Sequence, residues 1–159
     1  MKKLSKILMS LILSLGIIVP LQIVKVDAYF INGDFDMGFM EATNRGCLDD
    51  LYVSGTTLRM RGWHLFSFSP PYSYMFVIDA RTGLELARYM YTPVSRPDVS
   101  AAYGDNRNFG FDLSVNTSKF RGKTVWVMSR KTGNKTGDPS NIGTQNANLY
   151  WTSKKIYIP

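Results

Sequence analysis

The sequence predicts an all-β fold, a single antiparallel β-sandwich of seven or eight strands with one short connecting helix. Apolar and polar residues alternate through most of the chain after residue 46, and a period of two is typical of strands that bury one face. Turn residues interrupt this alternation at intervals of about ten residues. Short strands with such regular turns favour two packed antiparallel sheets over a parallel sheet with crossover helices.

Eight segments carry the strand pattern: 51–53, 58–63, 74–78, 84–91, 109–115, 124–130, 149–151 and 156–158. Two hairpins are expected between neighbouring segments. Ser54-Gly55-Thr56-Thr57 joins the first two strands, and Arg81-Thr82-Gly83 joins the third to the fourth. Gly83 can adopt the positive φ that closes a tight turn.

Residues 97–103 are the only helix expected after residue 28. Pro97 suits the first helical position, and Asp98 suits the positive end of the helix dipole. Gly104 is a stop signal. The segment therefore predicts a connector of at most two turns.

The first 28 residues have the pattern of a secretory signal peptide. Lys2, Lys3 and Lys6 precede an apolar run over residues 7–24, and Val26-Asp27-Ala28 provides small residues before a cleavage site at Tyr29. No second apolar run, lipid-accepting cysteine or sorting motif follows. We expect residues 1–28 to be removed, residues 29–45 to form a lead segment, residues 46–159 to form the sandwich, and the product to be secreted without an anchor or a membrane span.

The remaining 131 residues suffice for one domain with its own core. Loss of four lysines and one aspartate with the signal peptide lowers the formal net charge from +7 to +4. This mild basicity lacks the dense stripe of nucleic-acid-binding proteins, so no nucleic acid is expected. It suits acidic polymers, which in a Gram-positive setting would be teichoic acids.

The residue inventory argues against an enzyme. Cys47 and His64 are the only cysteine and histidine, and no common nucleophile or zinc spacing occurs. Cys47 is read as a small buried hydrophobe, with a reactive thiol or an intermolecular bridge as alternatives. A Cys47/His64 dyad, or a glycosidase pair among Asp49, Asp50, Asp79 and Asp112, has the residue types but no sign of the arrangement. No cofactor is expected.

The polar stretch from Lys131 to Asn148 is the longest expected loop. Loop oxygens there, or near Asp34 and Asp36, could hold calcium, but their spacing is not distinctive. No metal site is expected.

Six short motifs carry a resemblance to a known module. They are Gly46-Cys47-Leu48-Asp49-Asp50-Leu51, Ser54-Gly55-Thr56-Thr57-Leu58, Gly62-Trp63-His64, Ile78-Asp79 with Thr82-Gly83-Leu84-Glu85-Leu86-Ala87-Arg88, Arg96-Pro97-Asp98-Val99 with Ala102-Tyr103, and Asn108-Phe109-Gly110-Phe111. In order and spacing, residues 46–151 resemble a module of secreted proteins, cell-wall hydrolases and phage lysins of lactobacilli and their relatives. In that family the module accompanies a peptidoglycan-cutting domain or repeats in tandem, whereas this chain has one copy and no catalytic domain. The resemblance implies a role in holding a protein on the cell envelope.

Each candidate site residue is assigned either a structural role or a role in ligand binding. Arg96 and Asp98 flank a proline and are expected to form an ion pair that fixes a crossover between two sheets, with ligand contact as the alternative. Trp63 and Trp126 are expected in the core. Ligand-binding candidates are Tyr72 and Tyr74 on a loop after Pro70-Pro71, His64 at a loop edge, and Trp151 on a half-polar strand.

These observations predict a secreted, non-catalytic module that binds cell-envelope polysaccharide, peptidoglycan or teichoic acid. Tyrosine and tryptophan rings cover the apolar faces of sugars, while neighbouring polar side chains bind the hydroxyl groups. The alternative is a bacteriocin-like antibacterial protein, whose partner would be a receptor on the surface of a target cell. The lone module and the absence of an anchor favour that alternative.

Overall fold

The computed structural model describes residues 44–141 and 146–159. The expected signal peptide (residues 1–28) and residues 29–43 of the expected lead segment lie outside this part of the chain. Residues 44 and 45, which the sequence placed in the lead segment, belong to the first strand instead.

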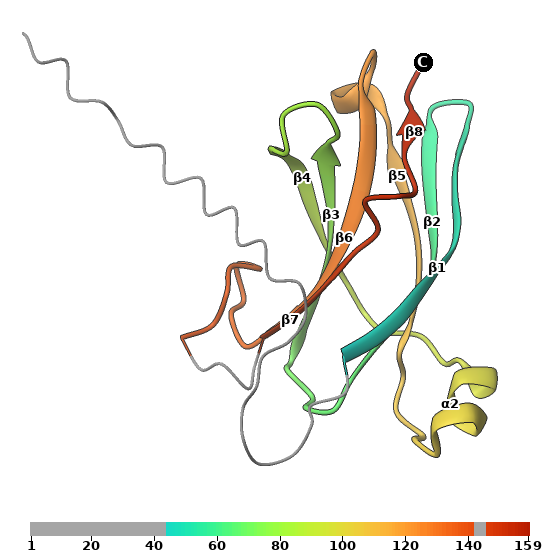
Figure 1. The fold of residues 1–159 in the computed structure, drawn as a ribbon, viewed down its shortest axis with the longest axis vertical. Coiled ribbons are helices and arrows are strands. Elements are labelled where there is room, and N and C mark those ends of the chain that lie inside the picture. The colour runs from blue at the N-terminus through green and yellow to red at the C-terminus, as the bar shows by residue number, and fades with distance from the viewer. Residues whose placement is uncertain (1–43, 142–145) are drawn as a thin grey trace, which may run out of the picture. The chain divides into compact units, whose positions relative to one another are not determined.

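The described residues form two antiparallel sheets packed together, as the sequence predicts (Figure 1). The strands are β1 (Asn44–Ser54), β2 (Thr57–Phe66), β3 (Tyr72–Asp79), β4 (Glu85–Tyr91), β5 (Gly110–Asn116), β6 (Thr124–Thr132), β7 (Asn146–Tyr150) and β8 (Ile156–Tyr157). The three-stranded sheet has the order β1-β2-β5, and the five-stranded sheet has the order β4-β3-β6-β7. The short strand β8 pairs with the beginning of β6, next to the part of β6 that pairs with β7.

Both expected hairpins are present. The β1–β2 turn contains Gly55 at φ 57°, and the β3–β4 turn contains Gly83 at φ 72°. The backbone N–H of Gly83 donates to the carbonyl of Asp79 at 2.8 Å, which closes the second turn. The glycines therefore occupy the left-handed conformations that other residues adopt at a cost.

The expected helix is α2 (Pro97–Tyr103), with the predicted bounds. It connects β4 of one sheet to β5 of the other. Gly104 ends it in the left-handed conformation, at φ 66°, and its N–H donates to the carbonyl of Ser100. A single 3-10 turn, η1 (Ser118–Phe120), connects β5 to β6.

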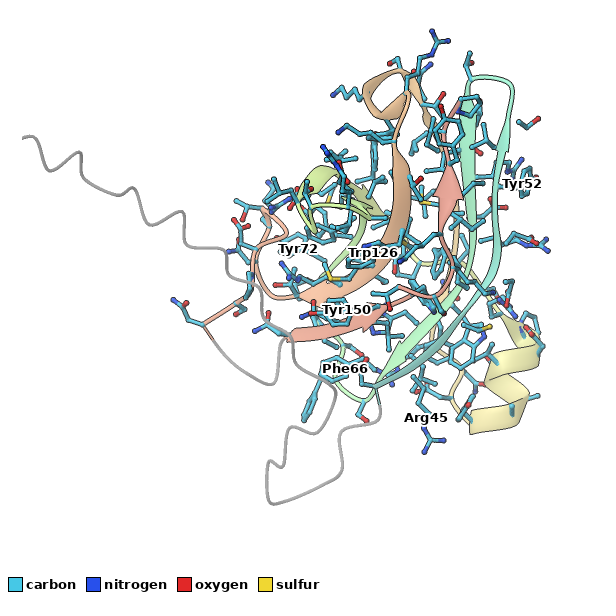
Figure 2. The ribbon with its side chains drawn as sticks, turned by 45° about the horizontal axis from the view of Figure 1, so that its top comes forward. Arg45, Tyr52, Phe66, Tyr72, Trp126 and Tyr150 are labelled. Atoms are coloured by element: carbon cyan, nitrogen blue, oxygen red, sulfur yellow. The ribbon has the colours of Figure 1, made fainter. Side chains whose placement is uncertain are left out.

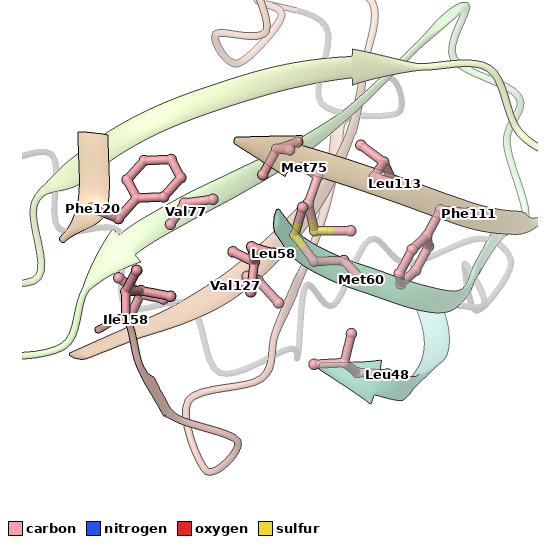
Figure 3. Packing of buried hydrophobic residues seen from close by; sticks show 12 residues of the cluster. Leu48, Leu58, Met60, Met75, Val77, Phe111, Leu113, Phe120, Val127 and Ile158 are labelled. Atoms are coloured by element: carbon pink, nitrogen blue, oxygen red, sulfur yellow. The ribbon is translucent and has the colours of Figure 1, made fainter. Parts of the chain in front are cut away.

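The main core lies between the two sheets (Figure 3). Every other residue of each central strand contributes to it, as the alternation predicts. Its fully buried members include Leu48, Leu58, Met60, Met75, Val77, Phe111, Phe120, Val125, Val127 and Ile158. Burial of side chains of this kind stabilises the fold by about 1.5–3 kcal/mol each.

Strand β3 is buried on both faces, which an antiparallel sandwich strand seldom is. Its residues Met75 and Val77 point into the main core, whereas Tyr74, Phe76 and Ile78 form a second cluster on the outer face of the five-stranded sheet. The outer face of this sheet is therefore apolar and distinguishes the two sides of the sandwich.

No helix in residues 44–141 and 146–159 has the length and apolar character needed to cross a membrane.

Candidate functional site

The outer face of the five-stranded sheet is arranged in rows by the strand register. From one end of β3 and β6 to the other, Ile78 pairs with Trp126, Phe76 with Met128, Tyr74 with Arg130, and Tyr72 with Thr132. Strand β7 extends three of these rows, placing Tyr150 beside Met128, Asn148 beside Arg130 and Asn146 beside Thr132. Aromatic rings thus lie in every row of this face.

Two arginines cover the middle of the face. The guanidinium carbons of Arg88 and Arg130 lie 5.0 and 4.8 Å from the ring centroid of Phe76. Arg88 donates both to Glu85, at 2.6 and 2.7 Å, and to Asp138 at 2.7 Å. Both guanidinium groups make cation–π contacts with the Phe76 ring. They cover the ring with polar groups, so its apolar face is not exposed to solvent.

The connection between β6 and β7 covers the part of the face around Tyr74. The Tyr74 hydroxyl donates to the carbonyl of Lys135, and Arg130 donates to the carbonyl of Gly137 at 3.0 Å. A Cβ atom at Gly137 would approach the Tyr74 ring to 3.0 Å, and φ at Gly137 is 85°. Only glycine fits this approach without strain.

Trp126 and Tyr150 remain partly exposed beyond this covered region (Figure 2). Their ring centroids are 6.3 Å apart at an interplanar angle of 53°. They pack on Ile78 and Met128, and Tyr72 packs on the other end of the same cluster. We refer to Tyr72, Trp126 and Tyr150 as the aromatic face.

The tyrosine candidates have different environments. Both belong to β3 and not to a loop, which corrects the expectation from Pro70-Pro71. Tyr72 is partly exposed and stays a candidate. Tyr74 is only 6% exposed and lies under the β6–β7 connection, so its assignment as a binding residue is wrong in this structure.

The tryptophans also differ from expectation. Trp126 and Trp63 were expected in the core, but both project from outer faces, and Trp63 lies beneath α2 with its ring 5.6 Å from Tyr103. Trp151 packs on the main core, 5.7 Å from the ring of Phe111. Trp151 therefore contributes to the packing of the fold, and the ligand role expected for it stays a prediction.

His64 is fully buried and cannot contact a ligand in this structure, so its assignment as a loop-edge binding residue is wrong. Its Nδ1 lies 2.8 Å from Ser129 Oγ, and its Nε2 lies 2.9 Å from Asn44 Oδ1. Burial, with the positive charge of Lys131, lowers its pKa well below the usual range. His64 is therefore a neutral link between β1, β2 and β6.

A chain of buried polar groups continues from His64 across the five-stranded sheet. The hydroxyl of Tyr91 lies 3.0 Å from Ser129 Oγ, and the ammonium of Lys131 donates to Ser73 Oγ at 3.3 Å. Burial lowers the pKa of Lys131 to about 8 and raises that of Tyr91 to about 12. These groups link the sheets at the end of the sandwich opposite the β1–β2 turn.

The ion pair expected between Arg96 and Asp98 is present. Arg96 donates to the two carboxylate oxygens of Asp98 at 2.8 and 2.6 Å and to Asp49 of β1 at 2.7 Å. The Arg96 guanidinium lowers the pKa of Asp98 to about 2. One arginine thus ties the crossover before α2 to the edge strand of the other sheet.

Glycines in two other motifs of the sequence, Gly62 and Gly110, allow close packing near this ion pair. A Cβ atom at Gly110 would lie 2.8 Å from Cγ of Arg96, and one at Gly62 would lie 2.7 Å from the ring of Phe111. Close packing therefore accounts for the glycines at these two positions, against Arg96 for Gly110 and against Phe111 for Gly62.

An open groove of about 370 Å³ lies beside this arginine. Its lining residues are Asp49, Arg61, Gly62, Val94, Ser95, Arg96, Phe111 and Asp112. Each charged group in the lining is already in an ion pair, because Arg61 binds Asp50 and Arg59 binds Asp112. A charged ligand would have to displace these internal partners, so the groove is the weaker site.

Cys47 is exposed, which corrects the expectation of a buried thiol. It pairs with Trp63 and projects from the outer face of the three-stranded sheet, whereas His64 projects into the interior. Partial burial and the neighbouring Asp49 raise the pKa of the thiol. A Cys47/His64 dyad does not form.

In the part of the chain that the structure describes, no group of three histidine, cysteine, aspartate or glutamate side chains is placed to bind a metal. No protein-family model, curated protein or solved structure matches the chain.

Sequence reasoning missed Trp126, Tyr150, Arg88 and Arg130 as site residues. The available signal was the continuous apolar run 74–78, because a strand without alternation is buried on both faces. That run indicates that the outer face of the five-stranded sheet is apolar too.

Proposed function

We propose that this chain is an exported, non-catalytic module that binds a cell-envelope glycan on its aromatic face. The observation that carries the proposal is the partial exposure of Tyr72, Trp126 and Tyr150 on a sheet face where polar residues are the rule. Apolar patches that remain on a surface mark binding sites more often than chance exposure does.

The chemistry of the aromatic face suits a sugar. Trp126 and Tyr150 present large rings held by the packing beneath them, so their immobilisation on binding costs little entropy. The side chain of Asn148, which accepts from Nε of Arg130 at 2.7 Å, lies in the neighbouring row. Rigid rings beside amide and guanidinium groups match the apolar faces and hydroxyl groups of a pyranose.

The positions of the reactive side chains support the proposal that the module is not catalytic. Cys47 and His64 are on opposite faces of the three-stranded sheet. Ser73 and Lys131 lie within hydrogen-bond reach of one another, but both are buried. A nucleophile and its base need access to a substrate.

The test compares the binding of folded variants to purified Gram-positive cell walls. Trp126→Ala removes the largest ring of the aromatic face, and Tyr52→Ala is the matched control, because Tyr52 is 45% exposed on the other sheet. We expect Trp126→Ala to weaken wall binding at least tenfold, which corresponds to about 1.4 kcal/mol. Tyr52→Ala should bind like the parent.

Each variant is first shown to unfold at the parent's midpoint. A folded Trp126→Ala protein that binds walls with unchanged affinity would refute the aromatic face as the site. Growth of the same cells in the presence of the parent protein tests the bacteriocin-like alternative. Mass spectrometry of the exported protein tests cleavage before Tyr29.

A further inference from the structure

We infer that one end of the sandwich carries a second binding surface, for a linear phosphate polymer. This surface comprises Arg81, Lys119, Arg121, Lys123 and Lys155, and we call it the cationic end. It is distinct from the aromatic face and goes beyond the glycan binding proposed above.

Backbone hydrogen bonds bring these residues together from different connections. The N–H of Ala80, next to Arg81, donates to the carbonyl of Thr124 at 2.8 Å. The N–H of Gly122 donates to the carbonyl of Ile158, and the N–H of Ile158 donates to the carbonyl of Lys123, both at 2.9 Å. The β3–β4 turn, η1, the start of β6 and β8 therefore meet at the end of the sandwich that also carries the β1–β2 turn (Figure 1).

Lys155 extends the surface toward the aromatic face. Lys155 directly precedes β8, in which Ile156 pairs with Val125, the residue before Trp126 in β6. Lys155 is exposed, as are Arg81, Lys119 and Arg121.

Four of the five cations at this end have no ion-pair partner among the described residues. All eight side-chain carboxylates in residues 44–141 and 146–159 are in ion pairs: Asp49, Asp50, Asp79, Glu85, Asp98, Asp105, Asp112 and Asp138. Of these, only Asp79 pairs with a member of the cationic end, through Lys123 at 2.9 Å.

Two exposed arginines on the three-stranded sheet show a contrast, although Arg45, also exposed, has no ion pair among the described residues either. Arg59 and Arg61 on the three-stranded sheet each bind an aspartate, at 2.9 and 2.7 Å. Arg81, Lys119, Arg121 and Lys155 take part in none of the ion pairs among the described residues. Neighbouring cations without partners repel one another, and an anionic ligand relieves that repulsion.

The backbone that carries these cations is held in place before any ligand arrives. Phe120 lies between Lys119 and Arg121 in the sequence and is fully buried in the main core, as is Ile158 beside β6. Gly122 follows at φ 72°. A fixed backbone reduces the ordering cost of binding to the side chains alone.

The arrangement favours a polymer over a single phosphate or a membrane. The cations come from three separate connections of the fold, so one phosphate could not reach them all. Successive phosphate groups of one polymer chain could contact the cations of all three connections. A membrane-binding surface needs a broad apolar face beside its cations, whereas the exposed large apolar side chains on the elements near this end, Leu84, Tyr157 and Tyr52, come from three different elements.

The experiment measures binding of the full chain to long-chain inorganic polyphosphate over a range of NaCl concentrations. The test variant is Lys119→Glu/Arg121→Glu. The matched control, Arg45→Glu/Lys135→Glu, makes the same change in net charge at two exposed cations outside the cationic end. Trp126→Ala separates this surface from the aromatic face.

We expect the parent to bind polyphosphate with an affinity that falls steeply with salt, because binding releases counterions. The test variant should bind at least tenfold more weakly with a shallower salt dependence. The control variant should bind within threefold of the parent, and Trp126→Ala within twofold.

Three results would overturn the inference. Equal losses in the test and control variants would show a response to net charge alone. Competition by orthophosphate at the same phosphate concentration would show a single-phosphate site. Vesicles of anionic lipid bound more tightly than polyphosphate would show a membrane surface.

Discussion

Replacement of the buried Lys131 by methionine should stabilise the protein at neutral pH. The ammonium of Lys131 is 7% exposed and has Ser73 Oγ as its hydrogen-bond acceptor, with no carboxylate paired to it among the described residues. The titratable and charged groups around it are His64 from β2, Tyr91 from β4 and Arg107 from the connection before β5. None of them offers a negative charge at pH 7, so the folded state disfavours the charged form.

The size of the effect follows from the pKa of Lys131, which falls from 10.5 to about 8 on folding. A fall of that size costs about 3 kcal/mol of stability at pH 7, where the unfolded state holds its proton more tightly than the folded state does. Methionine has a similar length and no charge. Loss of the hydrogen bond to Ser73 offsets about 1 kcal/mol, so we expect Lys131→Met to gain roughly 2 kcal/mol.

The pH dependence tests the cause. The folded pKa is lower than the unfolded one, so the cost is fully present below pH 8 and disappears as the pH rises toward 10.5. Urea unfolding at pH 7, 8, 9 and 10 should show the advantage of Lys131→Met shrinking by about 2 kcal/mol over this range. Lys135→Met, at an exposed lysine, is the control and should follow the parent.

Two outcomes would contradict this reasoning. A Lys131→Met protein that is less stable than the parent at pH 7 would show that the lysine is favourably solvated in place. An advantage that stays constant from pH 7 to pH 10 would show that packing, and not the charge, is responsible.

Two further predictions concern the polar links of the fold. Arg96→Ala should lower the free energy of unfolding by about 1–2 kcal/mol, because the arginine stem packs on Gly110 and its head ties Asp49 to the crossover. Wall binding should then fall only in step with folding, and a fully stable Arg96→Ala protein that no longer binds walls would assign this arginine to a ligand site. Stability should also fall as the pH drops from about 6.5 to 5, by up to about 1.4 kcal/mol per pH unit, because unfolding lets His64 take up a proton that its buried site refuses. Chemical denaturation checks this, and His64→Gln should remove most of the slope; an unchanged slope in that variant would exclude His64 as its source.

The sequence predicted the fold well because local rules determine these elements. The turn glycines define both hairpins, and Pro97 with Gly104 marks the bounds of α2. The pairing of Arg96 with Asp98 was also predictable, since only a proline separates them. None of these features depends on which side of a sheet a residue faces.

The incorrect predictions for Cys47, Trp63 and His64 concern which face of the sheet each side chain projects from. Cys47 was expected in the interior, but adjacent residues of a strand point to opposite sides, and its neighbour Leu48 takes the interior position. Trp63 and His64 do point to opposite sides, but the smaller, polar His64 is the one inside. It can be there because Ser129 and Asn44 satisfy both ring nitrogens. Such partners lie 65 and 20 residues away, and no local pattern reveals them.

The division of one sheet edge between β7 and β8 has a consequence for self-association. Strand β7 contributes five residues and β8 two, and the chain leaves the sheet between them through a turn at Trp151. A foreign strand adds to a sheet through a long, uninterrupted row of free backbone donors and acceptors. This edge interrupts that row after five residues, so a neighbouring copy finds no continuous template there. At this edge, the addition of a strand from another molecule is therefore disfavoured.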